Sequence, residues 1–394
     1  MPMSPSTAGR DTRSDANLPR FDSFVIADYS TDSRIVLTLD GGGTNFRFTA
    51  TQGNRPIVET VALPSCGDNL EHSLANIIEG FSRGQQQCPQ PPVAISFAFP
   101  GPADYPNGII GDLQHLPAFR GGVALGPMLE DRFSVPVFIN NDGDLFVYGE
   151  AIAGLLPYVN GLLENAGNPK RYRNLFGVTL GTGFGGGIVR NGELFLGDNS
   201  LGAEIWLLRN KLNPQTRVEE VAGIRGVRRF YAEKAKIPLE ESPDPRVIFA
   251  IGRGEKPGDK AAALEAFRQF GEVVGDAMGQ ALTIVDGLAV VGGGLSGAWP
   301  LFSQALMTEL NSSYARSEEN SVRRLIPEAF NLEATEELRK FLQPTIRDIA
   351  VPGSSRTAKY DASPCIGVGL SRLGTTEAVA IGAYAFALRR LDKP

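Results

Sequence analysis

Residues 35–50 read IVLTLDGGGTNFRFTA: an apolar β-type run, one carboxylate, three glycines, a threonine and a second run of alternating character. The pattern predicts a buried strand, a turn and a second strand. Gly41, Gly42 and Gly43 tolerate backbone angles that other residues avoid, so the turn can direct several N–H groups to one side and hold a phosphate. Asp40, at the strand end, can hold a hydrated Mg²⁺ against that phosphate. A glycine-rich hairpin with a surface aspartate explains the stretch equally well.

Length and composition indicate a soluble globular protein of two domains. The chain has 394 residues, of which 42% are hydrophobic and 21% charged, and this is long for a single core. The net charge of −6 gives no reason to propose a nucleic-acid partner. Cys66, Cys88 and Cys365 lack CxxC spacing, which argues against a disulfide framework or a cysteine zinc site and fits a reducing compartment.

The sequence gives no sign of a membrane or secretion segment. No window of about 18 apolar residues is apparent, so no membrane span is expected. Residues 1–33 are polar, rich in Ser, Asp, Arg and Pro, and are expected to form an arm rather than a secretion signal. A cytoplasmic location follows as the expectation.

Strands and helices alternate in the first part of the chain. Residues 93–99 predict a buried strand that stops at the rigid Pro-Gly-Pro turn of residues 100–102. Residues 135–139 predict another strand, which ends in Asn-Asn-Asp at 140–142 before a helix over residues 143–153. This order is typical of an α/β fold.

The pattern then starts again. Residues 176–180 predict a strand, GTGFGGG follows, and Asn191-Gly192 is a hairpin signal. The stretches LTLDGGGTN and VTLGTGFGG therefore form a weak internal repeat. This repeat predicts a duplicated architecture with one phosphate loop from each half. Residues 288–291 and the glycines at 292–294 supply a third strand-to-glycine junction.

The C-terminal part is expected to be largely helical. Residues 311–343 are charged and amphipathic, which predicts solvent-facing helices and a plausible subunit contact. Residues 352–363 are expected to form a loop. Residues 375–391 predict a final helix, with an acid in its first turn and arginines in its last. Its small residues allow close approach to a neighbour, so it can cross back between the two halves.

Two familiar nucleotide-binding motifs are not supported. Residues 181–186 match GxGxxG but lead into a hairpin, and residues 292–297 are not followed by a strand that ends in an acid. No GxxxxGK[ST] occurs in the sequence. What remains is three glycine junctions and an aspartate at a strand end. This set suits phosphoryl transfer, because that reaction depends mostly on positioning and charge neutralisation.

Asp142 is the candidate carboxylate for the acceptor hydroxyl. The alternative is that Asp142 is a helix N-cap, with Asp144 complementing the helix dipole. A helix N-terminus stabilises the charged carboxylate and makes it a poorer base, although a late proton transfer tolerates this. From the residues alone, the cap is favoured.

Five motifs resemble the ROK family of sugar kinases and regulators, which includes bacterial glucokinases. They are DGGGT at 40–44 with Arg47, FAFPGPAD at 97–104, Asn141-Asp142, LGTGFGGGIVRNGEL at 180–194 and VVGGG at 290–294. The motifs occur in family order over roughly residues 34–391. The resemblance implies an actin-like ATPase fold, in which two ribonuclease-H-like α/β domains enclose ATP and sugar in a cleft. The small domain would comprise residues 34–142 and the helix 375–391. The large domain would comprise residues 143–374, with a helical insertion around 311–343.

The resemblance also implies a sugar site. Asp142 would accept a proton from the 6-hydroxyl of the sugar, and Asn141 would bind a neighbouring hydroxyl. Two further carboxylates fall on Glu204 and on Glu219, with Glu220 as the alternative to Glu219. Carboxylates and carboxamides suit sugar hydroxyls because each can accept or share two hydrogen bonds.

Further positions depart from the family or are weaker candidates. Gly101 in the Pro-Gly-Pro turn and His115 in the loop after it are candidate sugar contacts, although a plain loop histidine is the simpler interpretation of His115.

The family usually has a histidine three residues after the Glu204 position, where this chain has Leu207. The cysteine cluster that binds structural zinc in many members is replaced by NKLNPQT at 210–216. A branch without a zinc site is therefore expected.

The implied cofactors are ATP and Mg²⁺. Asp40 would hold the Mg²⁺ through water. The phosphates and the adenosine would lie on the glycine loops. The implied nucleotide-binding residues are Asp40, Gly41, Gly42, Gly43, Thr44, Thr182, Gly183, Gly293 and Gly294.

The resulting expectation is a kinase that transfers phosphate from ATP to the 6-hydroxyl of glucose or a related hexose, such as mannose, fructose or an N-acetylhexosamine. The expected partner is a small sugar, with neither nucleic acid nor membrane, and a homodimer is expected because dimers are common in the family. The alternative is a non-catalytic or regulatory sugar-binding protein on the same fold, although the residues before Arg34 are too short and unpatterned for a DNA-binding helix-turn-helix. A nicotinamide dehydrogenase is a distant third.

Overall fold

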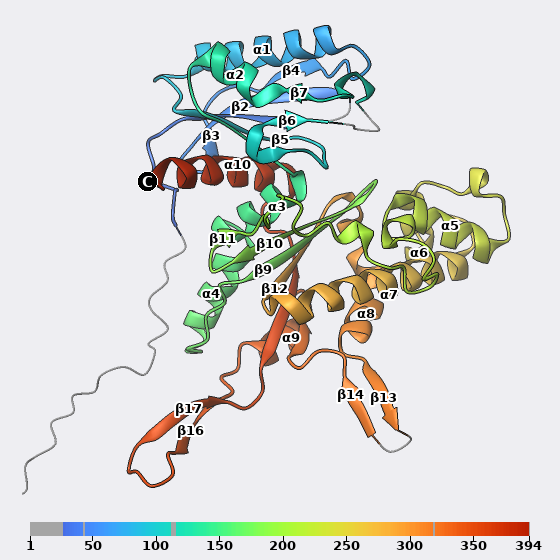
Figure 1. The fold of residues 1–394 in the computed structure, drawn as a ribbon. Helices are drawn as coiled ribbons and strands as arrows, with labels where there is room; N and C mark the ends of the chain where they lie inside the picture. Colours follow the sequence, from blue (N-terminus) through green and yellow to red (C-terminus); the bar gives the residue numbers. More distant parts are fainter. Residues whose placement is uncertain (1–26, 42–43, 112–115, 318–319, 394) are drawn as a thin grey trace, which may run out of the picture.

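The structure is a computed structural model, and it describes residues 27–41, 44–111, 116–317 and 320–393. Within these residues, two six-stranded sheets lie one above the other in Figure 1, with helices between them and on their outer faces. Three hydrophobic cores match these layers: one above the first sheet, one between the sheets and one beyond the second sheet.

The first sheet grows from the glycine-rich stretch in the order β3-β2-β1-β5-β8, and β4 also pairs with β2. β1 and β2 are antiparallel, with Leu39 opposite Phe48, whereas β5 and β8 continue the sheet in parallel. Phe46 and Phe48 are fully buried on one face, where the rings of Phe48 and Phe81 lie 5.0 Å apart. This burial explains the alternating pattern of the second strand. The elements of this half are β1 (Val36–Gly41), β2 (Asn45–Gln52), β3 (Arg55–Pro56), β4 (Val61–Pro64), α1 (Leu70–Gln87), β5 (Ala94–Ala98), η1 (Tyr105–Asn107), β6 (Ile109–Ile110), η2 (Pro117–Phe119), β7 (Val123–Ala124), α2 (Leu125–Phe133) and β8 (Val137–Asn140).

The second sheet has the order β11-β10-β9-β12-β18-β15. It too contains an antiparallel hairpin, β9 with β10, beside parallel strands. The two halves of the internal repeat, LTLDGGGTN and VTLGTGFGG, occupy the equivalent turns, β1 to β2 and β9 to β10. The elements are β9 (Leu175–Leu180), β10 (Phe184–Arg190), β11 (Glu193–Leu194), η3 (Ile205–Leu207), η4 (Val218–Glu220), α5 (Ile224–Ala235), η5 (Leu239–Glu241), α6 (Pro245–Arg253), α7 (Lys260–Val285), β12 (Leu288–Gly292), η6 (Gly294–Ala298), α8 (Trp299–Leu310), β15 (Glu328–Asn331), α9 (Thr335–Phe341) and β18 (Cys365–Leu370).

The layer between the sheets consists of α3 (Asp142–Ile152), α4 (Leu155–Asn165) and the last helix, α10 (Thr375–Asp392). In Figure 1, α10 lies directly under the first sheet and above α3, and it contacts β1, β5 and α3. The approach of α3 and α10 is too close for larger residues. A Cβ on Gly149 would lie 1.9 Å from the Ala378 carbonyl oxygen, and one on Gly382 would lie 1.9 Å from that of Leu145. The domain boundaries expected at 142/143 and 374/375 stay a prediction.

Glu150 anchors the segment that leads into α10. Its carboxylate is fully buried and accepts hydrogen bonds from the backbone N–H groups of Leu155 at 2.7 Å, Arg372 at 3.1 Å and Leu373 at 3.1 Å, and from the Ser371 hydroxyl. A buried carboxylate that is satisfied in this way fixes the groups that donate to it. The start of α10 is therefore held at the end of α3.

The structure differs from the expected helices and loop near the C-terminus. Residues 311–343 contain the hairpin strands β13 (Ser313–Ser317) and β14 (Asn320–Arg323), then β15, and among the described residues of this range only α9 forms an α-helix. Tyr314 faces Val322 across the hairpin, so the apolar residues follow strand alternation rather than helical spacing. The loop expected over 352–363 is half strand, because β17 (Thr357–Asp361) pairs with β16 (Ile346–Ala350). Both hairpins project from the lower end of the molecule in Figure 1.

Two expectations about exposed or apolar segments also change. Of the arm expected over residues 1–33, residues 1–26 lie outside the described residues, but Tyr29 is only 5% exposed and its ring lies 6.4 Å from that of Tyr384. Residues 142–165, helices α3 and α4 together, are long and apolar enough by length and composition to cross a membrane, contrary to the sequence reading. However, 67% of that window is buried inside the protein, so packing between the sheets accounts for its apolar residues.

Candidate active site

The first glycine turn leaves an accessible carboxylate at the edge of the first sheet. Asp40 is opposite Arg47 in the β1–β2 pair, yet no described residue forms an ion pair with it. Burial among surrounding protein atoms raises the pKa of Asp40, and the positive charge of Arg47 partly offsets this. Thr44 is exposed. Gly42 and Gly43 lie outside the described residues.

The second glycine turn meets the start of a helix. Gly181 accepts a hydrogen bond from the Ile224 N–H at 2.9 Å, which places the N-terminus of α5 against the turn between β9 and β10. Thr182 is exposed and Gly183 is half-buried. The unpaired N–H groups of a helix start favour anions, so α5 adds to the capacity of this turn for phosphate.

The third junction packs against the second. Gly293 has a φ of 86°, and a Cβ there would lie 2.4 Å from the Leu180 carbonyl oxygen at the end of β9. Its N–H donates to Thr375 Oγ1 at 3.0 Å, which connects the junction to the start of α10. A Cβ on Gly294 would meet no atom within 4 Å, so the backbone there is open to a ligand. The structure thus brings two of the three predicted glycine junctions together.

Strand register places Asp142 at the same sheet edge as Asp40. Asp40 pairs with Ala98 in β5, and Ala98 pairs with Asn140 in β8, so the two strand ends lie two strands apart. Adjacent strands are about 4.8 Å apart, which puts the two ends on the order of 10 Å from each other. The negative charge of Asp40 accordingly contributes to a raised pKa of Asp142.

The helix cap and the direction of the pKa shift of Asp142 both differ from the sequence-based prediction. Asn141 is the N-cap of α3, with its Oδ1 accepting from the Gly143 N–H at 2.8 Å, and Asp142 is the first residue of the helix. The Asp142 carboxylate also accepts from Gly143 N–H, at 2.9 Å, which lowers its pKa. Burial outweighs this hydrogen bond, so the net pKa of Asp142 is raised, although the side chain keeps an accessible face. A raised pKa makes Asp142 a better base than its helix-start position alone suggests.

The Pro-Gly-Pro turn is joined to Asn141 through a tyrosine. The Tyr105 hydroxyl donates to the Phe99 carbonyl at 3.0 Å and accepts from Asn141 Nδ2 at 3.5 Å. A Cβ on Gly101 would lie 2.1 Å from the same hydroxyl, so this close approach requires glycine. Gly101 and Asn141 therefore border one small region, and Tyr105 is a member that the sequence analysis did not identify. His115 lies outside the described residues.

The two expected glutamates lie in the second half of the chain, near the same region. Glu204 accepts a hydrogen bond from the Trp206 indole N–H, and its charge helps to raise the pKa of Asp144. Glu219 accepts from the Phe184 N–H at 3.4 Å, beside the second glycine turn. Both Glu219 and Glu220, the alternative, pair with Arg217, at 3.5 Å and 3.3 Å, and Glu220 also pairs with Arg225 at 3.7 Å.

The segment that replaces the family histidine and zinc ligands is held by hydrogen bonds within its own turn. Leu207 is 57% exposed. In the following turn, Asn210 N–H donates to the Thr216 carbonyl at 3.0 Å and Asn210 Nδ2 donates to Thr216 Oγ1 at 3.1 Å. Among the described residues, no group of three or more His, Cys, Asp or Glu side chains could hold a metal ion. The expectation of a branch without zinc stays a prediction.

Asp144 is a buried acid whose position the sequence analysis assigned only to the helix dipole. It is 3% exposed, and its Oδ1 has no hydrogen-bond partner among the described residues. Burial raises its pKa well above the ordinary value, and the charges of Glu204 and Asp142 raise it further. One sequence feature could have indicated that Asp144 is buried: it directly precedes the apolar run LFVYG, all of which is buried in α3.

Asp144→Asn is expected to flatten the pH dependence of stability. Because the folded-state pKa is above the unfolded value, the folded protein holds a proton that the unfolded chain has released, and stability falls as pH rises towards the folded pKa. Asparagine does not titrate, so the free energy of unfolding should fall less between pH 5 and pH 8.5 in the variant than in wild type. Urea unfolding at both pH values measures this. Parallel changes in the two proteins would contradict the assignment.

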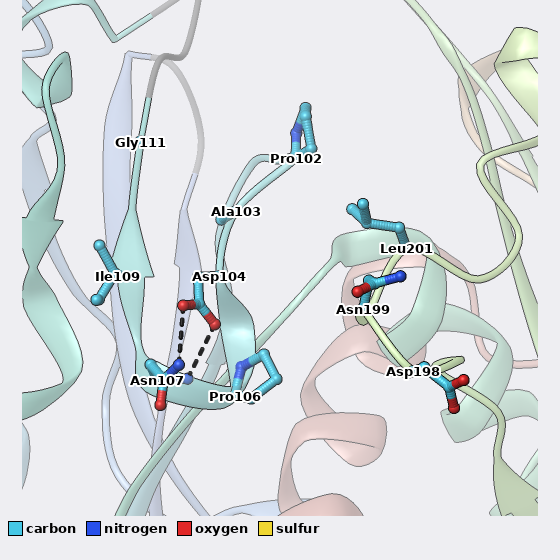
Figure 2. Close-up of a pocket in the computed structure, with 10 residues that line it drawn as sticks. All are labelled: Pro102, Ala103, Asp104, Pro106, Asn107, Ile109, Gly111, Asp198, Asn199 and Leu201. Atoms are coloured by element: carbon cyan, nitrogen blue, oxygen red, sulfur yellow. Dashed lines mark hydrogen bonds between the residues drawn. The ribbon is translucent and has the colours of Figure 1, made fainter.

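An open pocket separates the two halves at the rim of this site. Figure 2 shows the segment from Pro102 to Gly111 on one side and the loop from Asp198 to Leu201 on the other. The pocket has a volume of about 650 Å³. Asp142 is not among the residues that line it. The lining residues are Pro102, Ala103, Asp104, Pro106, Asn107, Ile109, Gly111, Asp198, Asn199 and Leu201.

Two α/β units, each with a sheet that combines an antiparallel hairpin with parallel strands, define the actin-like ATPase fold, and the comparisons with known proteins agree. The crystal structure of a glucokinase from Parabacteroides distasonis superposes with a TM-score of 0.84 at 49% sequence identity, covering 92% of this chain and 99% of that one. Among sequence relatives, a glucokinase from Thermotoga maritima is 27% identical over 281 residues, covering 67% of this chain and 83% of the relative. An N-acetyl-D-glucosamine kinase from Vibrio parahaemolyticus is 27% identical over 274 residues, covering 65% and 83%.

The sequence model of the ROK family matches residues 36–334. The chain therefore belongs to the ROK family, and its similarity to these relatives is to sugar kinases. This confirms the resemblance and the fold class inferred from the motifs. The roles of the individual site residues stay predictions.

Proposed function

We propose that this ROK protein is an ATP-dependent hexose kinase that phosphorylates the 6-hydroxyl of glucose or a related hexose. The observation that carries the proposal is the position of Asp142, at the sheet edge it shares with Asp40, with a raised pKa. A carboxylate of this kind, at the same end of the sheet as a turn proposed to bind phosphate, is suited to accept the proton of an attacking hydroxyl.

The proposed sugar contacts come from both halves of the chain. Asn141 and Gly101 belong to the first half, and Glu204 and Glu219 to the second, so a sugar would bridge them. Binding would draw the halves together and exclude water, which limits hydrolysis of ATP when no sugar is present. His115 remains a proposed contact on the basis of the family resemblance alone.

The residues present also suit Mg²⁺ and ATP. Asp40 offers an accessible carboxylate that forms no ion pair with a described residue, and Mg²⁺ prefers one or two carboxylates with retained waters. When bound, the ion would neutralise charge on the transferred phosphoryl group. The proposed phosphate contacts are Gly41, Gly42, Gly43, Thr44, Thr182 and Gly183, and the proposed adenosine contacts are Gly293 and Gly294.

A coupled ADP-release assay over a panel of sugars tests the function. We expect ADP release that requires both Mg²⁺ and sugar, with glucose, mannose, fructose, N-acetylglucosamine and N-acetylmannosamine as the panel. The panel includes N-acetylhexosamines because one of the sequence relatives is an N-acetyl-D-glucosamine kinase. NMR of the product should show phosphate on the 6-position. Sugar binding without sugar-dependent ADP release would favour the regulatory alternative.

A cytoplasmic location and a homodimer are further proposals from the family resemblance.

A further inference from the structure

The two proposed sugar carboxylates lie on adjoining 3₁₀ turns. Glu204 immediately precedes η3, and Glu219 lies within η4. The turns are joined by a backbone hydrogen bond from Val218 N–H to the Leu208 carbonyl at 2.7 Å. Neither turn is longer than three residues. Their backbones alone therefore leave the long glutamate side chains free to choose among rotamers.

Trp206 and Arg217 connect these side chains. The Trp206 indole N–H donates to Glu204 Oε2. The Arg217 guanidinium lies over the same indole, 4.8 Å from the ring centroid. Its Nε donates to Glu220 Oε1 at 3.3 Å, and its NH2 group lies 3.5 Å from Glu219 Oε1. The result is a continuous chain from Glu204 through Trp206 and Arg217 to Glu219.

Glu204 lies near two other carboxylates. Its negative charge, like that of Asp142, raises the pKa of the buried Asp144. A hydrogen bond to one carboxylate and a cation beside the other hold each of them in one orientation, and an oriented carboxylate can accept hydrogen bonds from sugar hydroxyls.

We propose that Trp206 and Arg217 are positioning residues for the sugar. Trp206 fixes the orientation of Glu204. Arg217, held between the indole face and Glu220, orients Glu219, so both carboxylates meet the sugar already oriented. The inference rests on the proposed function for the assignment of Glu204 and Glu219 as sugar ligands. It assigns to Trp206 and Arg217 an effect on sugar affinity and none on the nucleotide.

Trp206→Phe isolates the indole N–H, because phenylalanine keeps an aromatic face for Arg217. The dissociation constant for glucose, measured by calorimetry, should rise about 10-fold, since a hydrogen bond to a charged group is lost. The KM for glucose should rise by a similar factor. The kcat should stay within about 3-fold of wild type and the KM for ATP within about 2-fold, whereas a general structural defect would change all of these values.

Arg217→Gln tests the second link, and Arg225→Gln is its matched control. Arg225 also pairs with an acid of this segment, Glu220, but it is not stacked on Trp206. We expect Arg217→Gln to raise the glucose dissociation constant about 10-fold and Arg225→Gln to leave it within 2-fold. The double variant of Trp206 and Arg217 should fall well short of the 100-fold expected for independent residues, because both act through one chain.

The binding readout keeps this inference separate from the proposed function. If wild type binds glucose but does not turn it over, the proposed function fails, while the comparison of dissociation constants still decides the role of Trp206. A glucose affinity of Trp206→Phe within 2-fold of wild type would overturn the inference, as would an equal rise in the KM for ATP. If wild type binds neither glucose nor any other sugar of the panel, the inference falls with its premise.

Discussion

Asp142→Asn is expected to lower kcat for hexose phosphorylation by about 10³-fold, because the variant cannot accept the hydroxyl proton and general-base contributions are typically of this size. Folding and sugar affinity should change little. Asparagine retains an oxygen that can accept from the Gly143 N–H, as the aspartate does at 2.9 Å. Steady-state kinetics and calorimetry on the same preparation measure both effects.

Asp198→Asn is the matched control for this variant. Asp198 is an exposed aspartate at the rim of the same opening, on the loop shown in Figure 2. It should retain wild-type kcat within about 2-fold. Near-normal turnover by Asp142→Asn would remove Asp142 from the role of base and with it the central observation of the proposed function.

The raised pKa of Asp142 also sets the direction of the pH profile. The base must be deprotonated, so activity should decline as pH falls through its folded-state pKa. Burial and the charge of Asp40 place that pKa above the ordinary value of 3.8, and the acid limb of kcat should lie above it as well. The acid limb of the wild-type enzyme thus provides a test that requires no substitution.

Asp40→Asn is expected to lower kcat/KM for MgATP by about 100-fold, equivalent to about 3 kcal/mol of transition-state stabilisation. The reason is the loss of the single proposed carboxylate for the metal. The Mg²⁺ concentration that gives half-maximal activity should rise, while the calorimetric affinity for glucose should stay within about 3-fold of wild type. Titration of activity with Mg²⁺ at fixed ATP measures the shift.

Glu79→Gln is the control for Asp40→Asn. Glu79 lies on α1, at the outer face of the same sheet, where it forms an exposed ion pair with Arg83 at 2.6 Å. Removing its charge should leave the Mg²⁺ dependence unchanged. An unchanged Mg²⁺ requirement in Asp40→Asn would instead show that other groups hold the metal.

The fold was predictable where local patterns and global packing agree. The alternation of Phe46 and Phe48, the glycine turns and the apolar runs before them each point to strands, and each strand is buried as expected. The small residues of the final helix were a second such signal, because only glycine fits at the α3–α10 contact near Gly382.

The hairpins near the C-terminus were not predictable in this way. Their strands are only four or five residues long. In so short a segment, charged residues satisfy helical and strand spacing almost equally well. Pairing across the hairpin, as between Tyr314 and Val322, then decides the structure, and that is a tertiary effect.

In the candidate site, too, features set by the local sequence pattern were predictable, whereas those set by tertiary packing were not. A carboxylate at the end of a strand, such as Asp40 or Asp142, can be identified from the apolar run before it. The burial of Asp144 and the bond from Trp206 to Glu204 depend on how α3 and η3 pack, and no spacing in the sequence encodes that contact. The pKa of Asp142 was misjudged for a related reason: the helix start is local, whereas the burial that outweighs it comes from the surrounding fold.

The position of α10 has a consequence for how the chain is made. Its contacts with β1, β5 and α3 are with segments synthesised more than 200 residues earlier. During translation, the face of the first sheet that contains Val36 and its apolar neighbours therefore stays uncovered until residues 375–392 leave the ribosome. At about 5–20 residues per second this interval lasts on the order of ten seconds or more, a period in which chaperones have a natural binding surface.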